Sequence, residues 1–173
     1  RNPLVPIKGV YYTLEMDHLG QPVKKEGGMG VVYRCHYLSL QGEKVWAWIK
    51  HAKIDETKEE LLNKLLDDRN KEIQREINIQ SKVAELDYAP QVIAQSNFSA
   101  NNNEPKFTTF VQNEAKVASL YDLKDTLTHS ERVVVLTHFF EALIALHERG
   151  IYHCDLDLHH VYWEEHSKKI HLI

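Results

Sequence analysis

The sequence lacks several features that whole classes of protein require. It has two cysteines, Cys35 and Cys154, too few for a disulfide framework, which favours a reducing cytoplasm. No apolar run approaches the ~20 residues of a membrane-spanning helix, and the first residues show no apolar segment of a signal peptide. A net charge of −4 gives no reason to expect nucleic acid as a partner. Neither a cysteine pair nor the histidine spacing indicates a zinc site.

What is present suffices for one ordinary domain core, because the 173 residues are 43% hydrophobic. No internal repeat is visible. Residues typical of strands occur early, then a long helical pattern, then more strands, shorter helices and a last pair of strands. This order predicts an α+β fold with an antiparallel N-terminal sheet. The expected strands cover residues 8–19, 31–38, 45–50, 92–94, 106–112, 161–163 and 170–173.

Three helices are expected. Apolar residues recur every three or four positions over 55–86 without Pro or Gly, which predicts one long helix or two helices broken near Asp67. Asp55 or Thr57 would cap its N-terminus. A short helix is expected over 117–127. Another should begin at the cap residue Ser130, run to Glu148 and end at Gly150 as the C′ residue.

A Gly-rich segment, Lys25-Glu-Gly-Gly-Met-Gly-Val-Val-Tyr-Arg34, lies between two expected strands. Glycine allows a backbone to approach phosphate oxygens closely and to direct N–H groups at them. The segment resembles the Gly-rich loop of bacterial eukaryotic-like Ser/Thr kinases. Gly27 and Gly30 match the second and third glycines of that loop, whereas Lys25 occupies the position of the first. The resemblance implies nucleotide binding by Gly27, Gly28, Gly30 and Val32; the simpler alternative is a Gly-rich hairpin turn.

The next strand ends in Ala47-Trp48-Ile49-Lys50, which is similar to the kinase segment Val-Ala-Ile-Lys, whose Lys contacts the nucleotide phosphates. Strand alternation places Trp48 and Lys50 on one face. The family usually has Ala at the position of Trp48, against adenine, so Trp48 would fill or remodel that pocket. A solvated lysine at a strand end is the alternative reading of Lys50.

Within the long helical pattern, Arg75-Glu-Ile-Asn-Ile-Gln-Ser-Lys-Val83 resembles kinase helix αC, whose Glu pairs with the strand Lys. Glu76 is the first choice for that partner, and Glu72, one turn earlier, is the second. A glutamate on the solvent face of an amphipathic helix is the alternative.

The segment His153-Cys-Asp-Leu-Asp-Leu-His-His160 resembles the kinase catalytic loop His-Arg-Asp-Leu-x-x-x-Asn. The resemblance implies that Asp155 accepts the proton of the substrate hydroxyl, that His153 is structural, and that His160 stands at the metal-binding position. Cys154 replaces the Arg that meets a phosphorylated activation loop, so such control is less expected. Asp157 replaces a Lys near the transferred phosphate.

The remaining assignments rest on where each segment falls in the family's order of segments, and not on a motif. Residues 107–112 would be the strand before the hinge, where the backbone of Glu114 and Ala115 would meet adenine, and the last residues resemble the strand before Asp-Phe-Gly. The sequence given ends at Ile173, before that motif. We expect it to be the ordered part of a longer chain; a split protein and a natural minimal pseudokinase are the alternatives.

The resemblance as a whole implies a protein-kinase-like fold, with an N-lobe over 1–112 and part of a helical C-lobe over 113–173. It implies an ATP-dependent cytoplasmic phosphotransferase that uses Mg²⁺ or Mn²⁺ and acts on a protein hydroxyl. A pseudokinase that regulates a protein partner is one alternative. A kinase for sugars is another, because lipopolysaccharide core kinases also carry His five residues after the Asp. The oligomeric state stays open.

Overall fold

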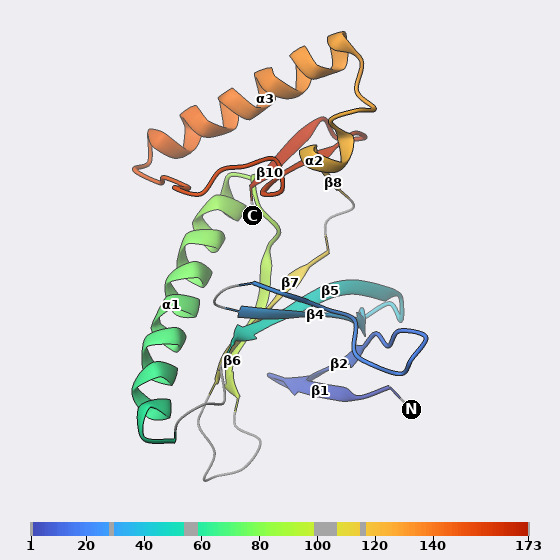
Figure 1. Cartoon of the computed structure of the whole chain (residues 1–173). Coiled ribbons are helices and arrows are strands. Elements are labelled where there is room, and N and C mark those ends of the chain that lie inside the picture. Colours follow the sequence, from blue (N-terminus) through green and yellow to red (C-terminus); the bar gives the residue numbers. More distant parts are fainter. Residues whose placement is uncertain (1, 28–29, 54–58, 99–106, 115–116, 173) are drawn as a thin grey trace. The chain divides into compact units, whose positions relative to one another are not determined.

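The computed structural model describes residues 2–27, 30–53, 59–98, 107–114 and 117–172. The chain divides into two compact units, Arg1–Asn78 with Gln91–Glu114, and Ile79–Pro90 with Ala115–Ile173. The elements run from five strands through a long helix, three strands and two helices to a last pair of strands (Figure 1), and the predicted α+β class with an antiparallel N-terminal sheet is confirmed. Along the described residues, no helix is long and apolar enough to cross a membrane.

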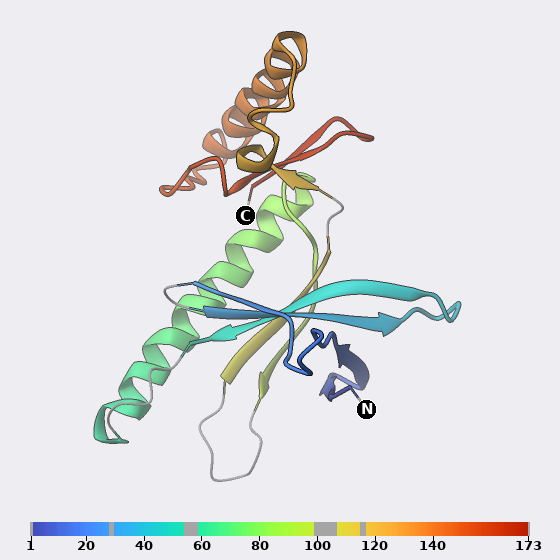
Figure 2. The ribbon, with the colours of Figure 1, turned by 45° about the vertical axis from the view of Figure 1, so that its right-hand side comes forward.

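The first unit contains a seven-stranded antiparallel sheet in the order β1-β2-β4-β5-β7-β6, with β3 paired to β4. Its strands are β1 (Leu4–Ile7), β2 (Val10–Leu14), β3 (Lys24–Glu26), β4 (Gly30–Leu38), β5 (Lys44–Ala52), β6 (Val92–Phe98) and β7 (Phe107–Asn113). β4 and β5 form the long ribbon that Figure 2 shows from a second side. The expectation of one β run over 8–19 is wrong at both ends, because β2 covers only Val10–Leu14. Lys8 and Gly9, with φ of 48° and 82°, form the tight turn between β1 and β2.

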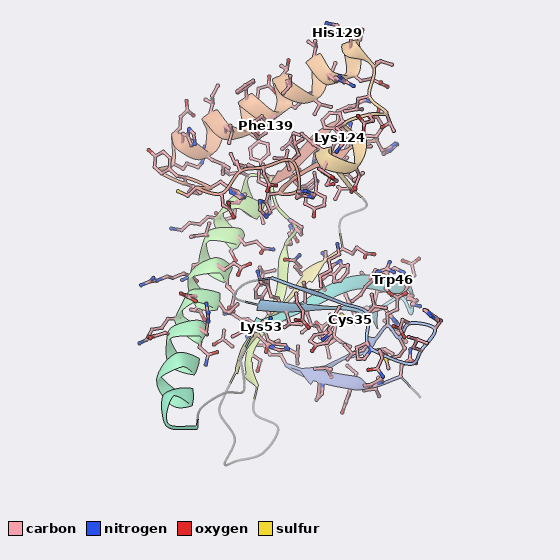
Figure 3. All side chains as sticks on the ribbon, in the orientation of Figure 1. Cys35, Trp46, Lys53, Lys124, His129 and Phe139 are labelled. Atoms are coloured by element: carbon pink, nitrogen blue, oxygen red, sulfur yellow. The ribbon has the colours of Figure 1, made fainter. Side chains whose placement is uncertain are left out.

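One face of this sheet holds a core of side chains buried from solvent. β1 lies near β6, so the sheet curls around this core. The core residues are Ile7, Tyr12, Cys35, Ala47, Ile49 and Val111. Burial, with a smaller effect of the Glu114 carboxylate, raises the pKa of the Cys35 thiol to about 12. Cys35 is therefore a neutral, unreactive core residue, and its place in the sheet is labelled in Figure 3.

The opposite face of the sheet contacts α1 (Glu59–Glu85). This is one uninterrupted helix rather than two; the candidate caps Asp55 and Thr57 lie outside the described residues. Ile73 and Ile77, one turn apart, are buried against Ala52 and Phe110, as the spacing of apolar residues in an amphipathic helix requires.

The second unit holds a three-stranded sheet, order β10-β9-β8, beside two helices. Its elements are β8 (Ala118–Ser119), α2 (Leu120–Leu123), α3 (His129–His147), β9 (Val161–Glu164) and β10 (Lys169–Leu172). Residues 79–90 belong to this unit, since the Leu172 N–H donates to the Tyr88 carbonyl at 2.7 Å. The predicted helix over 117–127 is wrong in extent. Ser119 accepts a hydrogen bond from the Asp122 N–H, and the helix that it caps covers four residues.

The ends of α3 follow known capping rules, although the start differs from prediction. Ser130 is not the cap; Thr128 is, and it forms a capping box in which Thr128 and Glu131 each bond the other's backbone. The hydrogen bonds from Thr128 lower the pKa of Glu131. At the other end Gly150 has φ of 69°. Its N–H donates to His147 and that of Ile151 to Leu146, so Gly150 closes the helix in a Schellman motif, as predicted.

The capping box gives a direct test. Thr128→Ala removes an acceptor for a free N–H of the first turn, so the free energy of unfolding should fall by about 1 kcal/mol. Ser130→Ala, two residues on and inside the helix, should change it by less. Urea unfolding of the two variants measures the difference, and an equal loss in both would contradict the assignment of Thr128 as the cap.

Candidate functional site

The centre of the site in the first unit is an ion pair between β5 and α1. Lys50 lies opposite Val32 of β4 and Phe110 of β7. Its ammonium donates a hydrogen bond to Oε1 of Glu76. The second-choice partner, Glu72, instead accepts from Arg69 at 3.1 Å. The structure therefore brings together Lys50 and Glu76, with Val32 beside Lys50.

Gly30 allows the β3–β4 hairpin to lie against the Lys50 side chain. A Cβ at this position would come within 3.1 Å of Lys50 Cε and 3.2 Å of the His51 carbonyl oxygen. The Gly27 N–H donates to the Gly30 carbonyl at 2.9 Å, and a Cβ on Gly27 would meet only that oxygen, at 3.9 Å. Gly28 lies outside the described residues. The requirement for glycine at position 30 thus comes from close approach to the backbone carbonyl of His51 as well as to the Lys50 side chain.

Trp48 lies on the same face of β5 as Lys50, opposite Arg34 of β4. The ammonium of Lys25 lies over its indole ring, 5.2 Å from the ring centroid. This is a cation–π contact, for which the limit is about 6 Å. The face that carries Lys50 therefore also carries an aromatic ring with a cation over it.

Arg34 was absent from the predicted site, yet it links three strands of this face. Its guanidinium donates to both carboxylate oxygens of Glu114, at 2.7 and 3.0 Å, and to Glu15 at 2.8 Å. These bonds, first those with Glu114, raise the pKa of Arg34. Strand alternation alone could have predicted that Arg34 lies on the face of Trp48. Its partners Glu15 and Glu114 could not be predicted in this way, because they lie far from it in the sequence.

Glu114, predicted to meet adenine through its backbone, lies at the end of β7. Its N–H donates to the Trp46 carbonyl at 3.1 Å, so only its carbonyl is left to bind a base. Ala115, the other predicted hinge residue, lies outside the described residues. Its contribution to the site stays a prediction.

The other candidate residues lie in the loop of the second unit before β9. The Asp155 side chain is exposed, and its carbonyl oxygen lies 2.8 Å from Nδ1 of His160. A carbonyl oxygen can only accept, so Nδ1 carries the proton. With the proton at Nδ1, Nε2 is the nitrogen of His160 that a metal could bind.

The Asp157 side chain also forms hydrogen bonds with the backbone of this loop. Its Oδ1 accepts from the His159 N–H at 2.6 Å and from the His160 N–H at 3.2 Å. These bonds, chiefly that with His159, lower the pKa of Asp157. The carboxylate therefore has a structural use in this loop, as a brace for the turn that positions His160.

His153 and Cys154 complete the loop. His153 is half-buried, and its Nδ1 accepts a long hydrogen bond of 3.4 Å from the Asp155 N–H, in keeping with its predicted structural role. Cys154 has φ of 62°, in the left-handed region that is costly for a residue with a Cβ. Backbone strain of this kind is typical of functional loops.

Whether a metal ion would fit near His160 depends on the donor atoms of the surrounding side chains. Among the side chains that the structure describes, no group of three or more His, Cys, Asp or Glu residues gathers to hold an ion. His160 offers one nitrogen, whereas Mg²⁺ prefers oxygen ligands in near-octahedral geometry. The described residues do not by themselves form a magnesium site.

Comparison with known proteins adds no family to this description. No protein-family model matches the chain, and no curated protein matches its sequence. Function is therefore inferred from the residues of the two units alone.

The contact between Gly30 and Lys50 can be tested by adding one methyl group. Gly30→Ala should lower the free energy of unfolding by about 1–3 kcal/mol, because the new Cβ meets a backbone carbonyl as well as the lysine. Gly27→Ala is the matched control, with an open contact on the same hairpin. Denaturant unfolding of both variants compares them, and equal stability would show that the hairpin does not lie on Lys50.

The brace by Asp157 predicts a pH dependence. Its pKa is lowered in the folded loop, so its contribution is complete above the unfolded pKa, near ~3.9. The contribution is lost as the pH falls through the still lower folded pKa. NMR titration should show the amide shifts of His159 and His160 following the Asp157 carboxylate below pH ~4. In Asp157→Asn these amides should lose that transition; its persistence would argue against the brace.

Proposed function

We propose that this chain is a protein-kinase-like phosphotransferase domain, with an N-lobe over residues 1–112 and part of a C-lobe over 113–173. It would transfer the γ-phosphate of ATP to a protein hydroxyl in the cytoplasm. The observation that carries the proposal is the ion pair of Lys50 with Glu76. The sequence motifs predict this pair across 26 residues, with Glu76 as the first candidate and Glu72 as the second.

The pair has a clear use in phosphate binding. A carboxylate beside an ammonium holds the cation in one position, and an ammonium is a strong partner for phosphate oxygens. Gly30 supports this role, because it lets the hairpin backbone lie beside Lys50. Backbone N–H groups of such a hairpin can bind the phosphates on their other side.

In the second unit Asp155 would orient the acceptor hydroxyl and take its proton. Its exposed side chain and the backbone bonds of the loop to His160 and Asp157 support this role. Nε2 of His160 stays the candidate ligand for Mg²⁺ or Mn²⁺, and no step of the proposal depends on that ion.

The contacts around Trp48 favour one alternative, a pseudokinase that binds a protein partner. Lys25 lies over the ring where a nucleobase would be expected, and the Glu114 N–H is already bonded within the sheet. Both features reduce what the face offers to adenine. A protein of this kind would bind nucleotide weakly or not at all.

Nucleotide binding separates the two functions. A thermal-shift titration with ATP and Mg²⁺ or Mn²⁺ should show a stabilisation that grows as RT ln(1 + [L]/Kd). Lys50→Ala should weaken this stabilisation, and Lys53→Ala should not, because Lys53 lies beyond the end of β5 and pairs with Glu26 at 3.5 Å. No shift of the wild type at millimolar ATP would favour the pseudokinase.

Phosphotransfer by the full-length protein tests the enzyme assignment. Asp155→Ala should lower the rate by about 100-fold or more, since it removes the group that accepts the proton. It should leave ATP stabilisation unchanged, because Asp155 is assigned to the acceptor hydroxyl. Radiolabelled transfer to a generic protein substrate provides the assay, with Lys53→Ala as the control for a surface change. Full activity of Asp155→Ala would rule out its assigned role.

A further inference from the structure

The face of β5 that carries Lys50 also carries an aromatic ring. Its distance from Lys50 suits a nucleotide whose phosphates bind the lysine while its base contacts the ring. Trp48 is two residues from Lys50 on the same strand, which separates their Cα atoms by about 7 Å. Trp46, labelled in Figure 3, lies further along the same strand. Its ring already has Arg34 and Lys44 over it, each at 4.2 Å. Trp48 has one such cation, Lys25, and it is the ring closer in sequence to the phosphate-binding candidate.

Lys25 reaches Trp48 because of strand register. β3 pairs with β4 so that Lys25 lies opposite Val32, and Val32 lies opposite Lys50. Alternation then directs Lys25 to the face of Trp48. Its neighbours Lys24 and Glu26 point to the other face and form an ion pair with each other. The contact of Lys25 with the indole is therefore fixed by the β3–β4 ladder and not by a neighbouring charge on its own strand.

We propose that Lys25 regulates nucleotide binding at this face, because it competes with the base of the nucleotide for the indole ring of Trp48. A nucleotide would have to displace the ammonium from the indole before its base could stack. The inference rests on the proposed nucleotide binding, and it assigns to Lys25 a role in setting affinity that a glycine in its place would not have.

The size of the effect follows from the contact that is lost. An exposed cation–π contact accounts for a change of about two- to five-fold in an equilibrium constant. Lys25 also carries a charge that attracts phosphate, which would mask the competition if ATP alone were used. Adenosine has the base without the phosphates, so its binding reports only the competition between Lys25 and the base for the indole of Trp48.

The test is calorimetric titration of adenosine into the wild type and three variants. Lys25→Ala should bind adenosine about two- to five-fold more tightly than the wild type. Lys24→Ala is the matched control: it removes the same charge from the same strand but from the other face, and should bind as the wild type does. Trp48→Leu, which keeps apolar volume but has no aromatic face, should bind at least about five-fold more weakly.

Several results would overturn the inference. It fails if Lys25→Ala binds adenosine no more tightly than Lys24→Ala does, or if Trp48→Leu binds like the wild type. It also fails if ATP stabilises the wild type while adenosine binds none of the proteins, and in that case the proposed function survives. Binding of neither ligand to any of the proteins would remove both. Circular dichroism checks folding, and Trp48→Phe, which keeps an aromatic face, should retain binding if Trp48→Leu does not fold.

Discussion

The ion pair of Lys50 and Glu76 is the interaction on which the interpretation of the first unit depends. It joins the middle of a curled sheet to a helix that contacts the same face through Ile73 and Ile77. The apolar contacts position the helix, and the helix in turn positions the carboxylate. With side chains 26% and 37% exposed, both partners keep contact with water, so the pair contributes little to stability. Its value is in fixing where a positive charge is held.

The local chemistry of the sequence predicted much of this arrangement. The order of strands and helices, the single long pattern of α1 and the glycine that ends α3 all depend on neighbours close in sequence. The prediction of Ser130 as the cap of α3 was wrong because Thr128, two residues earlier, is also a good cap residue. The capping box with Glu131, which the structure shows, distinguishes them. The start of α2 was missed for a similar reason, since one capping serine, Ser119, decides where so short a helix begins.

Contacts across the sheet could not be predicted in the same way. Lys25 meets Trp48 only because three strands are aligned in one register, and Arg34 joins Glu15 and Glu114 from distant segments. Register depends on every turn between the strands, so these neighbours become visible only in the folded sheet. Asp157 differs, because its contacts are local. Its charge suggested a disturbance at a phosphate site, whereas its carboxylate accepts hydrogen bonds from the backbone N–H groups of residues two and three positions further on.

The different environments of the two cysteines have a practical consequence. Cys35 is fully buried, and its high pKa keeps it as an unreactive thiol, whereas Cys154 is exposed beside Asp155. Because an exposed thiolate is the nucleophile that attacks thiol reagents, a maleimide dye or spin label added to the folded wild type should modify one position. The 173 residues thus offer a single exposed cysteine, in the loop of Asp155, and spectroscopy can follow that loop without any substitution.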